Sequence, residues 1–301
     1  MFSQSQGVLL MKKQRNEAVQ ALCFVLPSLV LILTFSVLPI LMNGYISLTK
    51  YNIIQKPQWV GLANFSRMFK DQYVWAALKN TTLFTLFTVP IQTFVSLVFA
   101  AWIATNFQSR YGRMVKSALF IPVIASAVLV GTLWSLLLSP RGPVNMIMQG
   151  IGLDPINWLG GKLSSLLSVG MVSVWKNIGY FLVIFYAGIM DIPASHYEAA
   201  KVDGATVWQQ FFYITLPSLS SVTYLVVTLG TIWSFQVFDI VYTMTGGGPG
   251  LSTVTLVLTI YNAAFKEYNM GYASAVALLM FVFVILIQAL QKRLVRAGRE
   301  G

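Results

Sequence analysis

The chain has 301 residues, of which 56% are apolar and 10% charged, whereas a typical water-soluble domain has about 25% charged residues. So few charges could not cover the surface of a soluble protein of this size, which excludes that class. The net charge of +11 arises as much from the scarcity of acidic residues, of which there are 9, as from the 20 basic residues. The basic residues form short clusters between apolar runs, so a nucleic-acid partner is not expected. The single cysteine, Cys23, provides neither a disulfide framework nor a cysteine-based metal site. We therefore expect an integral membrane protein without a metal centre.

Six apolar segments are long enough to cross about 30 Å of hydrocarbon as helices. They are Val19–Met42, Thr81–Thr105, Met114–Leu138, Ser165–Met190, Leu216–Val241 and Gly271–Gln291. Pro90 and Pro122 lie inside two of them, where a neighbouring helix can satisfy the freed carbonyl groups. The runs lack the alternation that barrel strands need. The sequence therefore predicts an all-α integral membrane fold with six transmembrane helices.

Lysines and arginines between the spans predict that both termini lie in the cytoplasm. This orientation places 11 basic residues inside and 8 outside, five of the latter in a long first outer loop where charge has little influence. The predicted organisation is a cytoplasmic segment at 1–18, a six-span domain at 19–291 and a basic cytoplasmic tail at 292–301. Within the domain, the outer loop 43–80 mixes aromatic and charged residues, which is typical of short amphipathic elements at the membrane surface.

The cytoplasmic loop 191–215, between spans four and five, has the pattern of a helix–turn–helix. Pro193 can open a helix, Ser195 offers a capping hydroxyl, and Gly204 permits a turn into a second short helix. Small Ala199 and Ala200 leave the first helix narrow enough to enter a groove. We expect this loop to dock on a soluble partner as a helix in a groove.

These residues also carry a family resemblance. Glu198-Ala199-Ala200, followed by Gly204 and then Ile214-x-Leu216-Pro217, resembles the EAA loop of permease subunits in binding-protein-dependent ABC importers. The Asp203-Gly204-Ala205 version, the Gly61-Leu62-x-Asn64-Phe65 segment and the Thr245-x-Gly247-Gly248-Pro249 turn are similar to the carbohydrate branch, which contains the maltose and glycerol-3-phosphate permeases. The resemblance implies a type I importer transmembrane domain in a prokaryotic plasma membrane.

The resemblance further implies how the loop works. Its helix would insert into a cleft of a cytoplasmic ATPase and transmit the closure of that ATPase to the pore. The residues implied in this coupling are Glu198, Ala199, Ala200, Asp203 and Gly204. The chain lacks a Gly-x-x-x-x-Gly-Lys-Ser/Thr loop, so ATP and Mg would be bound by the partner ATPase, and no cofactor is expected on this chain. We therefore expect a translocation subunit and not an enzyme.

Polar side chains inside spans four and five suggest where a substrate passes, because such groups usually face an interior. Counted along each span at 1.5 Å per residue, Asn177 and Trp233 lie roughly 20 and 25 Å from the inner side, hence at similar depth. Gly230, Trp233, Gln236 and Asp239 are spaced by three, which predicts a stripe on one helix face. Family positions imply substrate contacts at Tyr180, Trp233, Ser234 and Val237, and side-chain chemistry adds Asn177, Gln236 and Asp239.

Several of these residues have alternative interpretations. Trp233 and Tyr180 could pack helices together, and Asp239 could lie at the outer interface. Lys176 could pair with Asp239, extend its ammonium toward the interface, or meet an anionic substrate. His196, the only histidine, has no second ligand and is expected to be structural.

The expected partners are a second related permease, two copies of the ATPase, an extracytoplasmic binding protein, a sugar substrate and the lipid bilayer, with no nucleic acid. The main rival is an ion-coupled secondary transporter, which would need ionisable relays at mid-depth, where only Lys176 is charged. A membrane-embedded enzyme would need a catalytic set that one histidine and nine acids do not supply.

Overall fold

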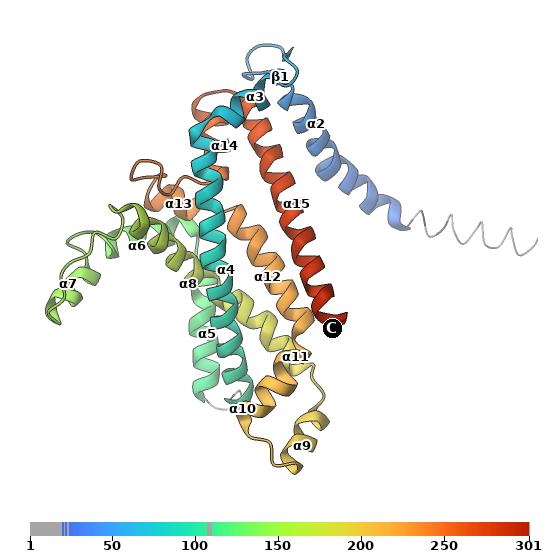
Figure 1. Cartoon of the computed structure of the whole chain (residues 1–301), viewed down its shortest axis with the longest axis vertical. Coiled ribbons are helices and arrows are strands. Elements are labelled where there is room, and N and C mark those ends of the chain that lie inside the picture. Colours follow the sequence, from blue (N-terminus) through green and yellow to red (C-terminus); the bar gives the residue numbers. More distant parts are fainter. Residues whose placement is uncertain (1–19, 21, 23, 107–109, 301) are drawn as a thin grey trace, which may run out of the picture.

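The computed structural model describes residues 20, 22, 24–106 and 110–300. The predicted segment 1–18 and Cys23 lie outside this range. The described chain is almost entirely helical and elongated, and the loop 191–215 lies at the opposite end of its long axis from the loop that contains the two strands (Figure 1).

The first third of the described chain contains two long helical segments joined by a small hairpin region. Its elements are η1 (Leu33–Val37), α2 (Leu38–Ser47), β1 (Thr49–Lys50), β2 (Gln58–Trp59), α3 (Ala63–Lys70) and α4 (Gln72–Asn106). The remaining elements are α5 (Arg110–Ile124), α6 (Ala127–Leu137), α7 (Pro143–Gly150), α8 (Lys162–Met190), α9 (Ala194–Val202), α10 (Val207–Gln210), η2 (Phe211–Thr215), α11 (Leu216–Ser218), α12 (Ser220–Phe235), α13 (Asp239–Met244), α14 (Leu256–Tyr261), η3 (Asn262–Lys266) and α15 (Met270–Glu300).

Six membrane crossings are present if bent helices are counted as spans. Within the described residues, four helices are long and apolar enough to cross: Phe24–Ser47, Gln72–Thr105, Lys162–Met190 and Met270–Leu294. Two further crossings consist of helix pairs, one bent by 102° between Ile124 and Ala127 and one by 66° between Ser218 and Ser220. The all-α, six-span prediction is confirmed.

The third and fifth spans are nevertheless not the continuous helices that were predicted. The third is broken shortly after Pro122, and the bend of the fifth follows Pro217; each proline removes a backbone donor. The fifth span also ends early, because α12 stops at Phe235 and Asp239 begins a new helix. At the outer ends of other spans, α4 begins at Gln72, nine residues before the predicted start, so the helix extends into the predicted loop 43–80. The last helix continues to Glu300, through the predicted tail.

The core lies where α4, α8 and α12 pack together. Phe181 and Phe185 of α8 are fully buried there with Leu219 and Val226. Glycines allow the closest approaches: a Cβ on Gly179 would overlap the carbonyl group of Leu119 in α5. Close backbone contact through small residues is the usual way helices associate in lipid, where water does not drive them together.

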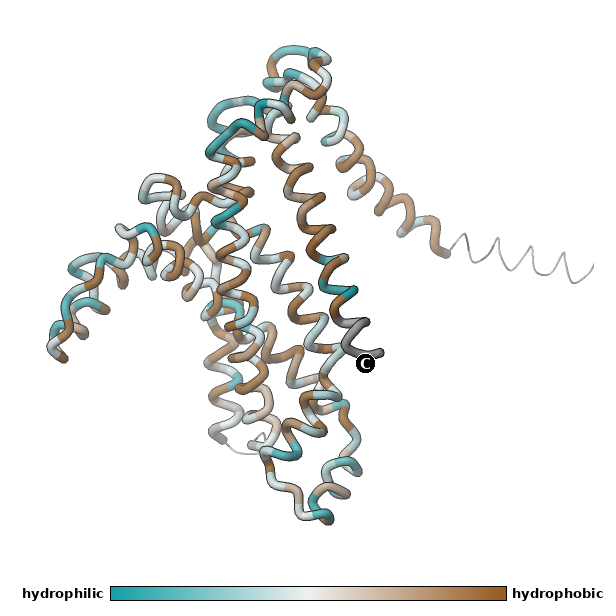
Figure 2. The backbone as a smooth tube through the Cα atoms, viewed as in Figure 1, coloured by the Kyte–Doolittle hydropathy of each residue, from teal (hydrophilic) through white to brown (hydrophobic). Residues whose placement is uncertain are grey.

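Two parts of the chain extend away from this bundle (Figure 1). On one side, the helix Phe24–Ser47 buries none of its most apolar stretch against the rest of the chain. On the other side, α6 and α7 project laterally beyond the break after α5. The tube is apolar along α2 and much of α15 (Figure 2), so these surfaces require lipid or another protein.

The outer loop is folded onto the end of the bundle. Strands β1 and β2 are antiparallel and pair Thr49 with Trp59. Asn64 donates from Nδ2 to the carbonyl groups of Ser47 at 2.8 Å and Thr49 at 2.9 Å. Gly271 at the start of α15 has no room for a Cβ beside the Thr49 carbonyl. The Asn64 amide thus anchors the loop that precedes α3.

Candidate functional site

The loop 191–215, called the coupling hairpin below, forms the predicted helix–turn–helix. Helix α9 ends in two hydrogen bonds, from the Gly204 amide to the Lys201 carbonyl at 3.1 Å and from the Ala205 amide to the Ala200 carbonyl at 2.8 Å. This pair is the Schellman arrangement, and it requires a left-handed residue between the helix and Ala205. Gly204 supplies it with φ of +79°. The predicted turn at Gly204 is therefore present.

The caps of the hairpin differ from the prediction. Pro193 is the N-cap of α9 and no side chain caps that end, so the expected capping role of Ser195 is wrong. The cap lies instead on α10, where Thr206 and Gln209 form a reciprocal capping box. The Thr-x-x-Gln spacing is a recognisable sequence signal that was missed. The Tyr197 hydroxyl contacts Thr215 Oγ1 at 2.9 Å and ties the two arms of the hairpin together.

The outer surface of the hairpin is exposed and partly apolar. Glu198, Ala199 and Asp203 are exposed, and Ala200 is half-buried. Val202 and Trp208 expose 88% and 73% of their surface at the same tip. Large apolar side chains this exposed at the end of a molecule mark an interaction surface.

The structure brings two of the predicted substrate residues into direct contact. The Tyr180 and Trp233 rings, from α8 and α12, have centroids 4.7 Å apart, and both rings lie near Phe181 at 5.5 and 5.4 Å. Trp233 is 36% exposed and Tyr180 is half-buried, so part of each ring packs in the protein and part remains accessible to a ligand. Asn177, half-buried, lies three residues before Tyr180 on α8. Spans four and five thus meet at this ring pair.

The predicted polar stripe along span five does not exist as one helix face. Because α12 ends at Phe235, Gln236 lies in a non-helical link and Asp239 is the first residue of α13; both are exposed. Ser234 is 5% exposed and its hydroxyl contacts Thr88 Oγ1 of α4 at 3.0 Å. Val237 is half-buried in the core around α13, and its carbonyl group accepts from Thr255 at 3.2 Å. As substrate contacts, these residues remain predictions.

A buried amide faces the same helix from α4, which the sequence analysis did not identify. Gln92 is 2% exposed, and its amide nitrogen occupies the space that a Cβ on Gly230 would take. With Thr88 bonded to Ser234, it forms a polar seam between α4 and α12. In a sequence, only polar residues within an otherwise apolar helix indicate a seam of this kind.

Two interactions of Lys176 in α8 are defined. Its Nζ donates to the carbonyl oxygen of Val123 at 3.3 Å, and the Asp239 carboxylate attracts the ammonium group. Neighbouring Trp175 contacts Trp134 of α6, with ring centroids 5.5 Å apart in an edge-on arrangement.

The glycine-rich segment after α13 is the predicted sharp turn. Gly246, Gly247 and Gly250 have φ of +59°, +99° and +59°. The Thr245 and Thr253 hydroxyl oxygens lie 2.7 Å apart across the turn. Glycine avoids the strain that a side chain would meet in this left-handed region.

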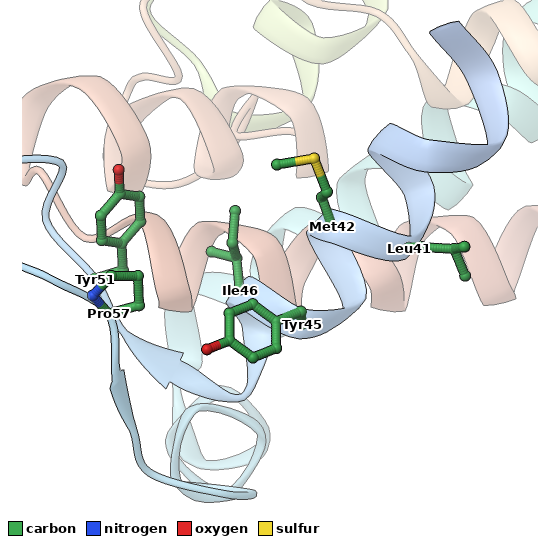
Figure 3. A pocket seen from close by; sticks show the side chains of 6 residues that line it. All are labelled: Leu41, Met42, Tyr45, Ile46, Tyr51 and Pro57. Carbon is green, nitrogen blue, oxygen red and sulfur yellow. The ribbon is translucent and has the colours of Figure 1, made fainter. Parts of the chain in front are cut away.

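A mainly apolar pocket lies between α2 and the loop that follows β1 (Figure 3). It has a volume of about 410 Å³ and is lined by Leu41, Met42, Tyr45, Ile46, Tyr51 and Pro57. Its residues come from α2 and the loop that follows β1, and it contains none of the candidate substrate residues. No cluster of three or more metal-ligating side chains occurs within residues that the structure describes.

Comparison with known proteins identifies the class. The family model described as "Binding-protein-dependent transport system inner membrane component" matches residues 80–299. The probable ABC transporter permease protein YurN of Bacillus subtilis is 32% identical over 92% of this chain and 96% of its own. The trehalose/maltose permease MalF of Thermococcus litoralis is 32% identical over 91% and 92%, and the lactose permease LacF of Rhizobium radiobacter is 33% identical over 92% and 94%.

Solved structures confirm the fold. A chain of a bacterial ABC transporter involved in import of the acidic polysaccharide alginate superposes with a TM-score of 0.80 at 24% identity, covering 96% of this chain and 98% of that one. A second structure of an alginate transporter, in complex with an alginate pentasaccharide-bound periplasmic protein, gives 0.82 at 23% identity over 96% and 97%.

These findings define a multi-pass, non-catalytic permease subunit of an ABC importer. The chain belongs to the family of inner membrane components of binding-protein-dependent transport systems.

Proposed function

We propose that this chain forms one half of the pathway of a sugar importer in a prokaryotic plasma membrane. A second, related permease completes the pathway, an extracytoplasmic binding protein delivers the sugar, and two copies of a cytoplasmic ATPase bind ATP and Mg and drive transport. The assignment of the substrate class is supported by the relatives named for trehalose/maltose, lactose and arabinooligosaccharides.

The coupling hairpin is the observation that carries the proposal. It lies at one end of the molecule and is closed by the Schellman turn at Gly204 and the Tyr197–Thr215 contact. Exposed Ala199 offers little bulk, so a groove in a partner can approach the α9 backbone, while Glu198 and Asp203 offer charges for directed contacts. A hairpin held at both ends can transmit a push from a soluble motor to α8 and α12.

The aromatic pair supports a sugar as cargo. Sugars present apolar C–H faces, which pack on rings, and hydroxyl groups, which pair with amide and carboxylate side chains. Tyr180 and Trp233 offer the rings, and Asn177 lies three residues from Tyr180 on the same helix. Gln236 and Asp239 are exposed beyond the end of α12 and offer polar groups close by in sequence.

An ion-coupled carrier is the alternative that fits less well. Such a carrier needs titratable relays, and Lys176, the one charged side chain well inside a predicted span, donates to a backbone carbonyl. The family to which the chain belongs also works with a separate binding protein.

Substitution of Gly204 tests the coupling role. We expect Gly204→Val to reduce ATP-dependent sugar uptake about tenfold or more while the protein still inserts, because a β-branched residue is strained at φ of +79°. Gly204→Asn is the matched control, because asparagine tolerates this conformation, and the position has open space for a side chain. Uptake by membrane vesicles and co-purification of the ATPase are measured in parallel. Normal uptake and normal ATPase binding in Gly204→Val would contradict the coupling role.

A further inference from the structure

The third span is broken at a point where a lysine of α8 lies beside it. Helix α5 ends at Ile124 and α6 begins at Ala127, with the axes at 102°. The carbonyl groups of the last turn of α5, which includes Val123, have no partner further along the helix. Ser126, the N-cap of α6, provides no side-chain cap. A broken helix inside a membrane needs such partners from elsewhere.

Lys176 supplies one of them. It is the midpoint of α8, 14 residues from Lys162 and 14 from Met190, where a charge is costly unless it is engaged. Its Nζ donates to the Val123 carbonyl at 3.3 Å. The C-terminal end of a helix carries partial negative charge, so a cation is favoured there. The lysine and the helix end thus satisfy each other.

The same lysine connects to a second break. Asp239, whose carboxylate attracts the ammonium group, is the first residue of α13, directly after the end of α12 and its non-helical link. A carboxylate is itself favoured at a helix N-terminus. Lys176 therefore contacts the end of one interrupted span and is within electrostatic reach of the restart of another.

The segments beyond the two breaks form a single body. Gly131 of α6 packs so closely on Thr243 of α13 that a Cβ would overlap the threonine hydroxyl. Val130 shares a core with Ile240 and Val241. We call α6 and α13 together the arm. The Trp134–Trp175 contact joins the arm to α8 one residue before Lys176.

We propose that Lys176 is a positioning residue that fixes the arm at the break after α5, with its ammonium group directed at the helix end and not at an anionic substrate. One N–H donor of its ammonium group is directed at the Val123 carbonyl, which holds the charge at the C-terminal end of α5. The proposal goes beyond transport itself, although its uptake readout rests on the proposed function.

The test measures the angle of the break directly. Ile121 and Leu133, on either side of the break and 67% and 50% exposed, are replaced by spin-labelled cysteines in the full chain carrying Cys23→Ser, purified with its partner subunits. Double electron–electron resonance reports the distance between α5 and α6. We expect a single narrow distribution in the parent protein, a clearly broader or shifted one in Lys176→Met, and a narrow one in Lys176→Arg, which keeps a charged donor.

Lys162→Met, the same change in an exposed lysine of the same helix, is the matched control and should leave the distribution unchanged. We expect uptake to fall about tenfold in Lys176→Met, the scale of leaving a buried polar group unpaired. If Lys176→Met does not assemble, Lys176→Gln takes its place; it retains an N–H donor without charge and should give an intermediate width.

An unchanged distribution in Lys176→Met, or a broad one in Lys176→Arg, would overturn the proposal. Loss of uptake with an unchanged distribution would identify the lysine as a substrate ligand instead. The measured distance between α5 and α6 does not depend on any sugar. Absence of uptake in the parent protein would therefore contradict the proposed function, while the distance measurement would still test the role of Lys176.

Discussion

Tyr180 and Trp233 lie on two different helices and are 53 residues apart in the sequence, yet their ring centroids lie 4.7 Å apart. Ring pairs at this separation contribute about 0.5–1.5 kcal/mol beyond the burial of their area. Both side chains are partly exposed, so their contact leaves part of the ring surface uncovered. The pair can therefore hold α8 to α12 and still offer a surface to a sugar.

Removing either ring tests this dual role. We expect Trp233→Ala and Tyr180→Ala to lower sugar-stimulated ATP hydrolysis of the assembled complex about tenfold, because each removes one apolar face for the sugar and one partner of the ring contact. Trp233→Phe, which keeps a ring, should retain most of the stimulation. ATPase assays on purified complexes measure the effect. If all three variants are stimulated as strongly as the parent complex, neither ring contacts the sugar.

At the residue scale, the sequence marked Tyr180 and Trp233 as candidates without predicting their ring contact, and it misplaced Gln236 and Asp239. Tyr180 and Trp233 lie at fixed offsets from the Glu-Ala-Ala and Gly-Gly-Pro motifs, so their positions could be predicted. Gln236 and Asp239 were placed on the same helix face because spacing by three suggests a continuous helix. The chain leaves the helix at Phe235, and no proline or glycine in the link announces it.

At the scale of the elements, glycines decide how closely α8 packs. Gly179 faces the backbone of α5 at Leu119, and Gly188 faces the side chains of Leu219 and Val222. The first contact is with backbone, which cannot move aside as a flexible side chain can. Position 179 therefore tolerates no side chain without separating α5 from α8.

Gly179→Val is expected to destabilise the protein by about 1–3 kcal/mol or more, since overpacking at a backbone contact forces the helices apart. Gly150→Val is the matched control, because Gly150 at the end of α7 has nothing within 4 Å of an added Cβ. The thermal midpoint of the detergent-solubilised protein, followed by size-exclusion chromatography, measures the difference. Equal midpoints for the two variants would show that the α5–α8 contact is not tight.

Hydropathy predicts some features of these helices and not others. The number and order of the apolar segments were correct, because each must match the thickness of the hydrocarbon. The breaks were not predicted, because the few serines at each bend do not interrupt the long apolar segments on either side. Pro122 was expected to be tolerated inside the third span and Pro217 to lie at the start of the fifth, whereas the chain bends by 102° and 66° nearby. A partner such as Lys176 for the freed carbonyls becomes visible only in three dimensions.

Considered as a whole, the chain is an open structure with unpartnered surfaces at several places. The coupling hairpin lies at one end, the helix Phe24–Ser47 extends along one side, and α6 and α7 project on the other (Figure 1). Apolar surface on the first helix is available for lipid or a second permease. Six crossings also make a thin wall for a solute pathway, which is consistent with the proposal that a second permease completes it.

The most direct test of this account is reconstitution of sugar uptake from purified parts. The chain alone, and the chain with its companion permease, ATPase and binding protein, are placed in sealed vesicles and supplied with radiolabelled sugar, with and without ATP and Mg. We predict uptake only in the complete system and only with ATP. Uptake by the chain alone, or uptake by the complete system driven by an ion gradient without ATP, would contradict the account.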